Sequence, residues 1–303
     1  MIYTCTLNPS IDYIIHVSEF QFGALNRGEK TSYYPGGKGI NVSRVLKRLD
    51  ITNTALGFLG DFTGDFIINK LQAESVKTDF IAVQGTTRIN MKMKSNKETE
   101  INGPGPSISS DKLDELYTQI SKLQSGDILV AAGSIPHTVP SDFYVKVAGI
   151  CEANGVQMVA DTSSQGLKEL LGTKLLLVKP NQHELGELFD VNIATIKDAV
   201  TYGKKLHDQG AEHVLVSMGG DGAVYISDQG SFIANAPKGT VQNTVGAGDS
   251  MVAGFLAAHT TAQSAEDTFR YAVATGSATA FNADLCTKSD VEALLDKIEI
   301  KST

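Results

Sequence analysis

Short apolar runs alternate with longer amphipathic stretches along most of this 303-residue chain. Residues 127–131, 175–178 and 214–216 are apolar at nearly every position, whereas residues 111–123 and 196–207 repeat apolar side chains at helical spacing. Continuous apolar strands that alternate with helices indicate a mainly parallel sheet covered on both faces. The pattern therefore predicts an α/β protein.

Two segments break this alternation. Residues 88–94 alternate apolar and polar side chains strictly, and residues 12–34 contain two similar short pieces. Such alternation is typical of strands with one wet face. We interpret the segments as a small antiparallel β lid, formed by about residues 12–35 and 86–102, above the strand ends where open α/β sheets bind ligands. We expect a single domain over residues 1–303 that carries this discontinuous lid.

The composition narrows the class of partner. Hydrophobic residues make up 42% of the chain, enough for one large core, and the formal net charge is -8 without any block of Lys or Arg. This balance predicts a small-molecule partner and neither a nucleic-acid nor a membrane surface. The three cysteines are widely separated, and we find no signal-peptide pattern or apolar run of transmembrane length. We expect a cytoplasmic protein with reduced thiols.

The run 243–250 is the strongest candidate for chemistry, because a glycine-rich turn and a carboxylate directly precede a helix-like apolar segment. The amides of Gly246, Ala247 and Gly248 would converge at the helix N-terminus, which favours developing phosphate charge. Asp249 could then accept a proton from an attacking hydroxyl. An ordinary helix cap explains an isolated run of this kind about equally well.

A second glycine-rich run, residues 35–44, opens another helix. Gly36 and Gly37 let the backbone approach a ligand closely, and Asn41 can both donate and accept a hydrogen bond. Lys38 suits a phosphate as a mobile point charge, although a solvated loop lysine is the usual alternative.

Further polar residues could complete an acceptor site. Asp12 follows the first strand and could accept hydrogen bonds from two hydroxyl groups of a ligand, with a turn cap as the alternative. Arg88, Asn90 and Lys92 share one face of the predicted lid strand, because alternate residues of a strand point the same way. With Lys38 and Arg27, this face would form a basic pocket for a phosphate.

Two more segments are candidates for nucleotide and metal contacts. Asn181 and Glu184 lie one helical turn apart after a buried strand and could hold hydrated Mg²⁺, while a capping box is the alternative and both can be true. The run 217–222 joins two strand-like pieces, so a hairpin turn explains it about as well as nucleotide contact. The motifs of P-loop proteins, dinucleotide-binding domains and protein kinases are absent.

Together, runs 35–44 and 243–250 resemble the two signatures of the ribokinase-like sugar kinases, the PfkB family. The resemblance covers essentially the whole chain and implies a ribokinase-like three-layer sandwich, with ATP and Mg²⁺ as cofactors. Segments 35–49, 85–90 and 98–106 resemble the branch that phosphorylates fructose 1-phosphate at O6. Tagatose 6-phosphate as the acceptor is the alternative, and a catalytically silent sugar-phosphate sensor is a third hypothesis.

The resemblance also implies a role for each candidate residue. Asp249 would be the base, with the amides of Gly246, Ala247 and Gly248 as the anion hole. It implies one larger set of residues that bind the acceptor and another that binds the nucleotide and the metal. The acceptor set is Asp12, Arg27, Gly36, Gly37, Lys38, Asn41, Arg88, Asn90, Lys92, Asn102 and Ser134. The nucleotide set is Lys179, Asn181, Ser217, Gly219, Gly220, Gly222, Thr244, Gly246, Gly248 and Asn282, with Glu184 and Asn181 on the metal.

One segment departs from the family pattern. Residues 133–138 read Gly-Ser-Ile-Pro-His-Thr where the family has GS[LI]PPG. We still expect Ser134 to reach the sugar, and we expect His137 to be an exposed loop residue. An apolar lid face at Met91 and Met93 could pack against the lid of a second copy and form a homodimer.

Overall fold

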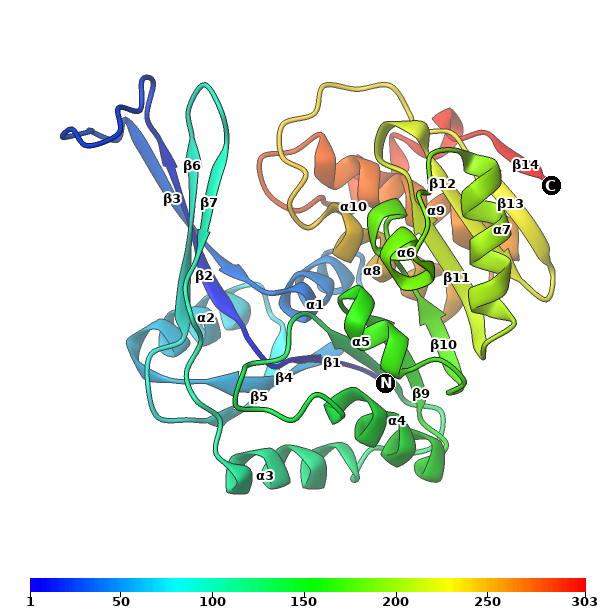
Figure 1. Ribbon diagram of the computed structural model, residues 1–303, viewed down its shortest axis with the longest axis horizontal. Helices are drawn as coiled ribbons and strands as arrows, with labels where there is room; N and C mark the ends of the chain where they lie inside the picture. The colour runs from blue at the N-terminus through cyan, green and yellow to red at the C-terminus, as the bar shows by residue number, and fades with distance from the viewer.

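A ten-stranded sheet, sheet A, forms the centre of the computed structural model, which describes residues 1–303 (Figure 1). The strand order is β14-β13-β12-β11-β10-β9-β8-β1-β4-β5. All pairs from β11 to β5 along this order are parallel, and the three pairs from β11 to β14 are antiparallel. The strands are β1 (Ile2–Thr6), β4 (Asn53–Leu59), β5 (Lys77–Ala82), β8 (Ile128–Ala132), β9 (Gln157–Asp161), β10 (Leu175–Val178), β11 (Ala211–Ser217), β12 (Ala223–Ser227), β13 (Gly230–Ala234) and β14 (Ile300–Ser302).

Helices cover both faces of sheet A, so the body has three layers (Figure 1). Helices α3 to α7 pack on one face and α1, α8, α9 and α10 on the other, while α2 packs in a smaller cluster near the lid. The helices are α1 (Lys38–Arg48), α2 (Asp61–Ala73), α3 (Ser110–Ile120), α4 (Phe143–Asn154), α5 (Ser164–Glu169), α6 (Gln182–Phe189), α7 (Ile196–His207), α8 (Ala247–His259), α9 (Ala265–Ala280) and α10 (Lys288–Glu292), with short 3₁₀ turns at Gly219–Asp221 and Leu295–Lys297.

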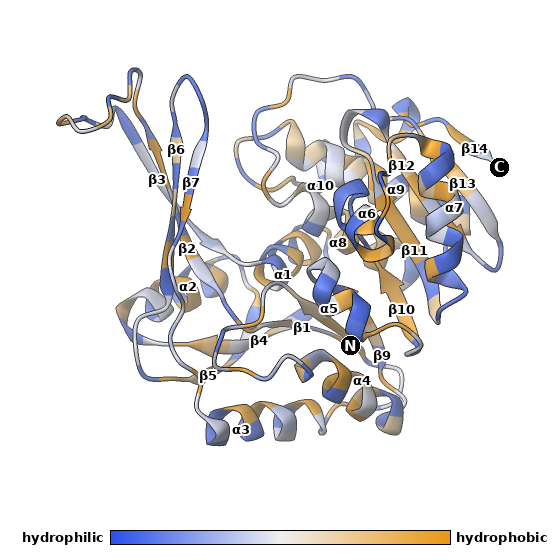
Figure 2. Ribbon diagram, in the orientation of Figure 1, coloured by the Kyte–Doolittle hydropathy of each residue, from blue (hydrophilic) through white to orange (hydrophobic).

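The central strands are apolar throughout because both of their faces are buried. In β8, Leu129 and Ala131 enter one core, whereas Ile128, Val130 and Ala132 enter the core on the opposite face. Successive side chains of a strand point to opposite faces, so a strand between two helical layers needs an apolar residue at every position. Figure 2 shows this as mostly hydrophobic strands inside the body. The predicted mainly parallel sheet with helices on both faces is confirmed.

The predicted helices also form. The segment 111–123 overlaps α3, which begins one residue earlier and ends at Ile120, and the segment 196–207 coincides with α7. Helix α7 begins with a capping box between Thr195 and Asp198. No helix has both the length and the apolar character that crossing a membrane requires.

A second sheet, sheet B, forms the lid and projects from the body (Figure 1). Its strands lie in the order β3 (Lys30–Gly36), β2 (Ser10–His16), β6 (Arg88–Lys94) and β7 (Thr99–Asn102). The β2–β3 and β6–β7 pairs are antiparallel, and a parallel β2–β6 pair joins them. The two chain segments predicted for the lid therefore meet along β2 and β6.

Candidate active site

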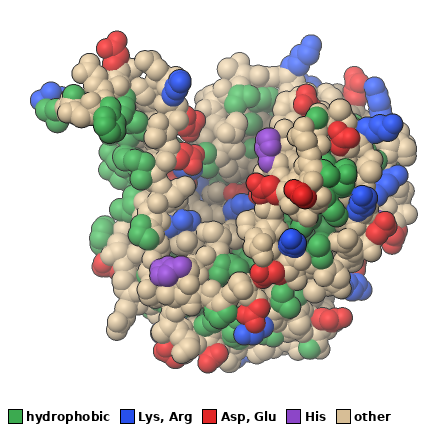
Figure 3. Space-filling view, viewed as in Figure 1, with side chains coloured by type: hydrophobic (Ala, Val, Ile, Leu, Met, Phe, Trp, Pro, Cys, Tyr) green, Lys and Arg blue, Asp and Glu red, His purple; other side chains and the backbone are tan.

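The candidate residues from distant parts of the chain meet at the carboxyl ends of the parallel strands, beside the lid. Helix α1 begins at Lys38 after Gly37, and α8 begins at Ala247 after Gly246. Lys179 and Asn181 follow β10. Figure 3 shows a hollow between the lid and the body, with charged side chains of both signs at its base. This is the edge at which open α/β sheets bind ligands.

Both glycine-rich turns have a backbone that other residues would not adopt easily. Gly37 has φ +118° and Gly246 has φ +80°, the left-handed region that favours glycine. At Gly36, a Cβ atom would lie 2.5 Å from an oxygen of Asp12. The glycines of the first run therefore place the start of α1 directly against the lid residue that was predicted to bind the sugar.

Asp249 lies in the first turn of α8 and is buried, with 7% of its surface exposed. Asn41 Nδ2 donates a hydrogen bond to Asp249 Oδ2 at 2.8 Å. Burial, and the nearby carboxylate of Asp161, raise the pKa of Asp249 to about 6, although Lys38 and Asn41 act in the opposite direction. A carboxyl group with such a pKa is ionised near neutral pH and is more basic than an ordinary carboxylate, as a general base requires.

Asp161, at the end of β9, is a site residue that we did not predict. Its carboxylate is 1% exposed and lies 2.9 Å from Lys38 Nζ and 3.6 Å from Lys179 Nζ. Burial alone would raise the pKa of Asp161, but Lys179 and Lys38 outweigh it and hold the pKa below its usual value. The available signal was a carboxylate at the carboxyl end of a buried strand, where sheet ligands bind.

Lys38 therefore contacts acidic residues of the body. Its Nζ also lies 3.9 Å from Glu184 Oε1, and the surrounding carboxylates of Asp161, Asp249 and Glu184 raise its pKa although burial lowers it. The lysine thus lies between the base and the predicted metal residue. Its grouping with the basic lid face around a phosphate stays a prediction.

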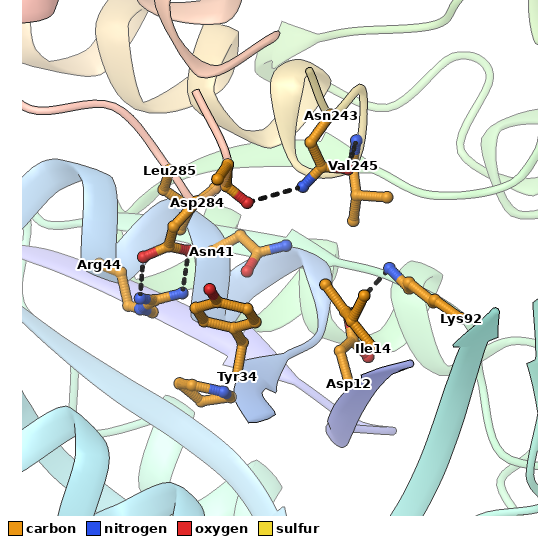
Figure 4. A pocket seen from close by; sticks show the side chains of 12 residues that line it. Asp12, Ile14, Tyr34, Asn41, Arg44, Lys92, Asn243, Val245, Asp284 and Leu285 are labelled. Atoms are coloured by element: carbon orange, nitrogen blue, oxygen red, sulfur yellow. Dashed lines mark hydrogen bonds and ion pairs between the residues drawn. The ribbon is translucent and has the colours of Figure 1, made fainter. Parts of the chain in front are cut away.

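The inner face of the lid is held together by polar contacts around Asp12. Lys92 Nζ lies 3.0 Å from Asp12 Oδ2, Asn90 Nδ2 donates to Ser10 Oγ at 3.1 Å, and Arg88 donates to the carbonyl oxygen of Asn8 at 2.9 Å. Figure 4 shows Asp12 and Lys92 pointing toward one another at one wall of a cavity. The predicted common face of Arg88, Asn90 and Lys92 thus adjoins the predicted sugar residue.

Several buried polar atoms at this site have no hydrogen-bond partner in the protein. They include Nε of Arg88, Oδ1 of Asn90, Oδ1 of Asn8 and Oδ2 of Asp161. A buried polar atom without a partner is costly and is rare away from ligand sites. Their position beside the lid and the helix starts fits a polar ligand that supplies the missing partners.

Three of the predicted acceptor residues are exposed, and two of them adjoin this arrangement, since Asn102 pairs with Asn90 across β7 and β6 and Ser134 contacts Asn8. Arg27 is exposed in the loop that joins β2 to β3 at the far end of the lid, and Asn102 is exposed on β7. Ser134 is exposed and lies 3.5 Å from Asn8 Nδ2. The adjacent departure from the family pattern has a structural use, since Thr138 Oγ1 accepts a hydrogen bond from the Ile108 amide, and His137 is exposed as expected.

The nucleotide and metal candidates come from two groups of elements: Lys179, Asn181 and the 217–222 turn follow β10 and β11, whereas Thr244 precedes α8 and Asn282 follows α9. Asn181 and Ser217 form a parallel bridge, and the turn after Ser217 contains Gly219 with φ +57° and Gly222 with φ +102°. Asn282 Nδ2 donates to the carbonyl oxygen of Ala278 at 2.9 Å. Gly220 and Thr244 are exposed, so their atoms remain accessible.

Asn181 and Glu184 form the capping box that was the alternative to a metal site at the start of α6. Asn181 Oδ1 accepts bonds from the amides of His183 and Glu184, both at 2.9 Å, and Glu184 Oε2 accepts one from the Asn181 amide at 2.9 Å. The side-chain oxygen of Asn181 therefore already accepts two hydrogen bonds from the backbone. Oε1 of Glu184 remains directed toward Lys38.

Comparison with known proteins agrees with this geometry. A family model described as pfkB family carbohydrate kinase matches residues 5–291. The chain is 50% identical to a Bacillus subtilis (strain 168) protein named 1-phosphofructokinase, over 99% of both chains. It is 40% identical to a Bacillus licheniformis protein named D-tagatose-1-phosphate kinase, also over 99% of both. Among solved structures, phosphofructokinase-2 from Escherichia coli in complex with substrates and products has a TM-score of 0.93 at 30% identity, covering 97% of this chain and 98% of that one.

Proposed function

Because the chain belongs to the pfkB family of carbohydrate kinases, we propose that it transfers the γ-phosphoryl group of ATP to O6 of fructose 1-phosphate. The product is fructose 1,6-bisphosphate. Family membership implies ATP as the phosphoryl donor. One observation of the site carries the proposal: Asn41 hydrogen-bonds the buried Asp249 and also lines a cavity together with Asp12 and Lys92. A base and a polar, charged acceptor pocket are thus joined through one side chain.

The reaction needs an anchored acceptor, a base and stabilisation of charge. Asp12 accepts hydrogen bonds from sugar hydroxyls, and Arg88 and Lys92 bind the phosphate already on the sugar. Asp249 accepts the proton of O6 as the bond from O6 to the γ-phosphorus forms and the bond to the β-phosphate oxygen breaks. The amides at Gly246 to Gly248 and the ammonium group of Lys38 stabilise negative charge on the transferring group.

We assign a magnesium contact to Glu184 alone. The bound metal would neutralise charge on the nucleotide phosphates. Mg²⁺ is commonly held through one or two carboxylates, with substrate phosphates and water as its other ligands. Oε1 of Glu184 is available for this, and no group of three His, Cys, Asp or Glu side chains forms a protein-only metal site. The oxygen of Asn181 already accepts two backbone bonds and does not fit the role that we predicted for it.

The acceptor is best tested by comparing substrates in a coupled ADP-release assay with ATP and Mg²⁺. We expect kcat/KM for fructose 1-phosphate to exceed that for fructose 6-phosphate, tagatose 6-phosphate and free fructose by about a hundredfold or more, because a site built around a charged phosphate rejects an analogue that lacks or misplaces it. A preference for a 6-phosphate would overturn the assignment of Arg88 and Lys92 to a C1 phosphate.

Tagatose 1-phosphate is a second candidate acceptor, favoured by the Bacillus licheniformis relative. It differs from fructose 1-phosphate in the configuration at C4, so both present the same phosphate to the lid. Tagatose 6-phosphate remains a weaker alternative. Including tagatose 1-phosphate in the same assay separates the two 1-phosphates, and a higher kcat/KM for tagatose 1-phosphate would replace the proposed substrate while keeping the mechanism.

The pH dependence should reveal the titration of Asp249. The base must be deprotonated, so kcat/KM is expected to fall below a pH of about 6. The hydrogen bond from Asn41 favours the ionised form, so Asn41→Ala should raise the pKa of Asp249 and move this acid limb to higher pH. Titration of ATP and of the sugar phosphate affects the pH profiles of the wild type and of Asn41→Ala equally, so it does not contribute to the difference between them. An unmoved limb would contradict the assignment of the limb to Asp249.

We also propose that two lids pack together in a homodimer. The outer face of sheet B carries Tyr33, Tyr13, Met91 and Ile101 in one row across the four strands. Tyr33 and Ile101 are more than half exposed, and Figure 3 shows hydrophobic side chains gathered on the lid. Met93, which we had included in this face, is buried instead. A monomer in a sedimentation measurement at micromolar concentration would overturn this proposal.

The three buried, unpaired cysteines fit a reducing compartment, and we propose the cytoplasm.

A further inference from the structure

A charged cluster borders the acceptor cavity, because two of its members, Arg44 and Asp284, line that cavity together with Asp12, Asn41 and Lys92. It comprises Arg44, Arg48, Glu74 and Asp284, and we refer to it as the arginine cluster. Arg44 is 3% exposed, and its guanidinium lies between two carboxylates, 2.7 Å from Glu74 Oε1 and 2.8 Å from Asp284 Oδ2. Arg48 binds the same Asp284 oxygen at 2.7 Å. Figure 4 shows the paired contacts between Arg44 and Asp284.

The two acidic residues of this cluster lie on different elements. Glu74 is the C-cap of α2. Asp284 belongs to the irregular segment between α9 and α10, and its neighbour Leu285 is buried against the anion-hole turn: a Cβ atom on Gly246 would lie 2.6 Å from Leu285 Cδ2. Arg48 also donates to the Leu285 carbonyl oxygen. The cluster therefore fixes the segment that packs against Gly246.

The same helix carries the other half of the site. Asn41 lies one turn before Arg44 on α1 and binds Asp249. Asn243, just before the anion-hole turn, donates to the Ala283 carbonyl oxygen at 3.4 Å. Thus α1 contacts the start of α8 directly through the Asn41–Asp249 hydrogen bond. The Ala283–Leu285 segment, which binds α1 on one side and the anion-hole turn on the other, forms a second connection.

The pKa values of Arg44 and Asp284 are both shifted toward the charged form. Burial would raise the pKa of Asp284, but the two arginines hold it below the usual range. Burial would lower the pKa of Arg44, but Glu74 and Asp284 raise it. Arg44 binds both carboxylate oxygens of Asp284 and one oxygen of Glu74, and this restricts the geometry because the guanidinium donors form a planar fork.

We propose that Asp284 is a positioning residue for phosphoryl transfer. Held by Arg44 and Arg48, it keeps Leu285 against Gly246 and so aligns the anion-hole amides and Asp249 with the acceptor bound at the start of α1. The inference rests on the proposed kinase function, because it concerns the alignment of two halves of that site. Asp284 acts through Leu285. Because it also lines the cavity that contains Asp12 and Lys92, an unchanged KM for the acceptor distinguishes this positioning role from direct binding of the acceptor.

The test compares Asp284→Asn with Glu74→Gln. Both changes remove one negative charge from a partner of Arg44 and keep a side chain of the same shape, but only Asp284 is connected to Gly246. We expect Asp284→Asn to lower kcat by roughly ten- to a hundredfold, since a small misplacement of reacting groups can cost about 10²-fold. KM for ATP and for the acceptor should stay within about threefold, and Asp284→Glu should recover part of kcat. Glu74→Gln should keep kcat within about twofold of wild type.

Thermal unfolding of each variant separates positioning from stability. Equal losses of kcat in the two variants, or a loss that follows the unfolding temperature, would overturn the proposal. If Asp284→Asn does not fold, Leu285→Ala tests the same contact without changing a charge, and wild-type kcat in that variant would also overturn it. The assay uses whichever acceptor the wild type phosphorylates fastest, so another acceptor would refute the proposed substrate and leave this comparison intact.

Discussion

Replacement of Asp249 by asparagine is expected to abolish turnover, lowering kcat by at least about a hundredfold and by up to about ten-thousandfold. The amide has nearly the same shape and keeps a partner for the Asn41 amide through its oxygen, but it cannot accept the proton of the attacking hydroxyl. ATP affinity should remain near the wild-type value, because the anion-hole amides are unchanged. A coupled ADP-release assay measures kcat, and calorimetry measures nucleotide binding.

An Asp-to-Asn change at an exposed position provides the matched control. Asp114 is exposed on α3, far from the site in sequence and structure, so Asp114→Asn should leave kcat unchanged. If Asp249→Asn retained more than about a tenth of wild-type kcat, Asp249 would not be an essential base.

The second large effect is expected for Lys38→Met, which should lower kcat/KM by about a hundred- to a thousandfold. The variant loses a positive charge beside the transferring group, where one lost donor typically costs about 10²–10³ in rate. It also leaves the buried Asp161 carboxylate with Lys179 as its remaining cationic partner, at 3.6 Å. The uncompensated charge would raise the pKa of Asp161 and further raise that of Asp249.

Two comparisons distinguish these effects of Lys38. Lys174→Met removes a lysine that is 75% exposed and paired at the surface with Glu212, so it should not affect catalysis. Lys38→Arg keeps the charge and should retain more activity than Lys38→Met. If Lys38→Met changed the unfolding temperature while leaving kcat/KM within about tenfold of wild type, the lysine would have a structural role and not a catalytic one.

The sequence predicted the parts of the fold that depend on periodicity. Strands such as β8 are apolar at every position because each face of sheet A is buried, and the strict alternation of 88–94 arises because sheet B has one polar and one apolar face. It did not predict that β2 and β6 pair in parallel. Pairing between segments about 80 residues apart leaves no local pattern in either one, because each strand alternates in the same way whichever neighbour it has.

The site was predictable where a local motif carries the chemistry. The glycine runs placed Gly36, Gly37 and Gly246 correctly at two helix starts because their backbone demands are local. Asp161 was missed because one carboxylate after a strand has many ordinary explanations, and its significance comes from two lysines that the fold brings to it. The carboxylate partners of Lys38 were not predicted for the same reason: a charge pairs with its spatial neighbours, which spacing along the chain does not reveal.

The alternation of β6 has a consequence for how this protein could acquire a new specificity. Asn90 and Lys92 lie on the inner face of the lid, where Lys92 lines the acceptor cavity, while Ile89 and Met91 lie on the outer face. Insertion or deletion of one residue within β6 would exchange the two faces along the rest of the strand, turning phosphate-binding side chains outward and placing apolar ones on the inner face. Such a shift of register would abolish both acceptor binding and the proposed contact between two lids. Acceptor specificity can therefore diverge here through substitutions that preserve strand length, and length variation is confined to the loops beyond the strands.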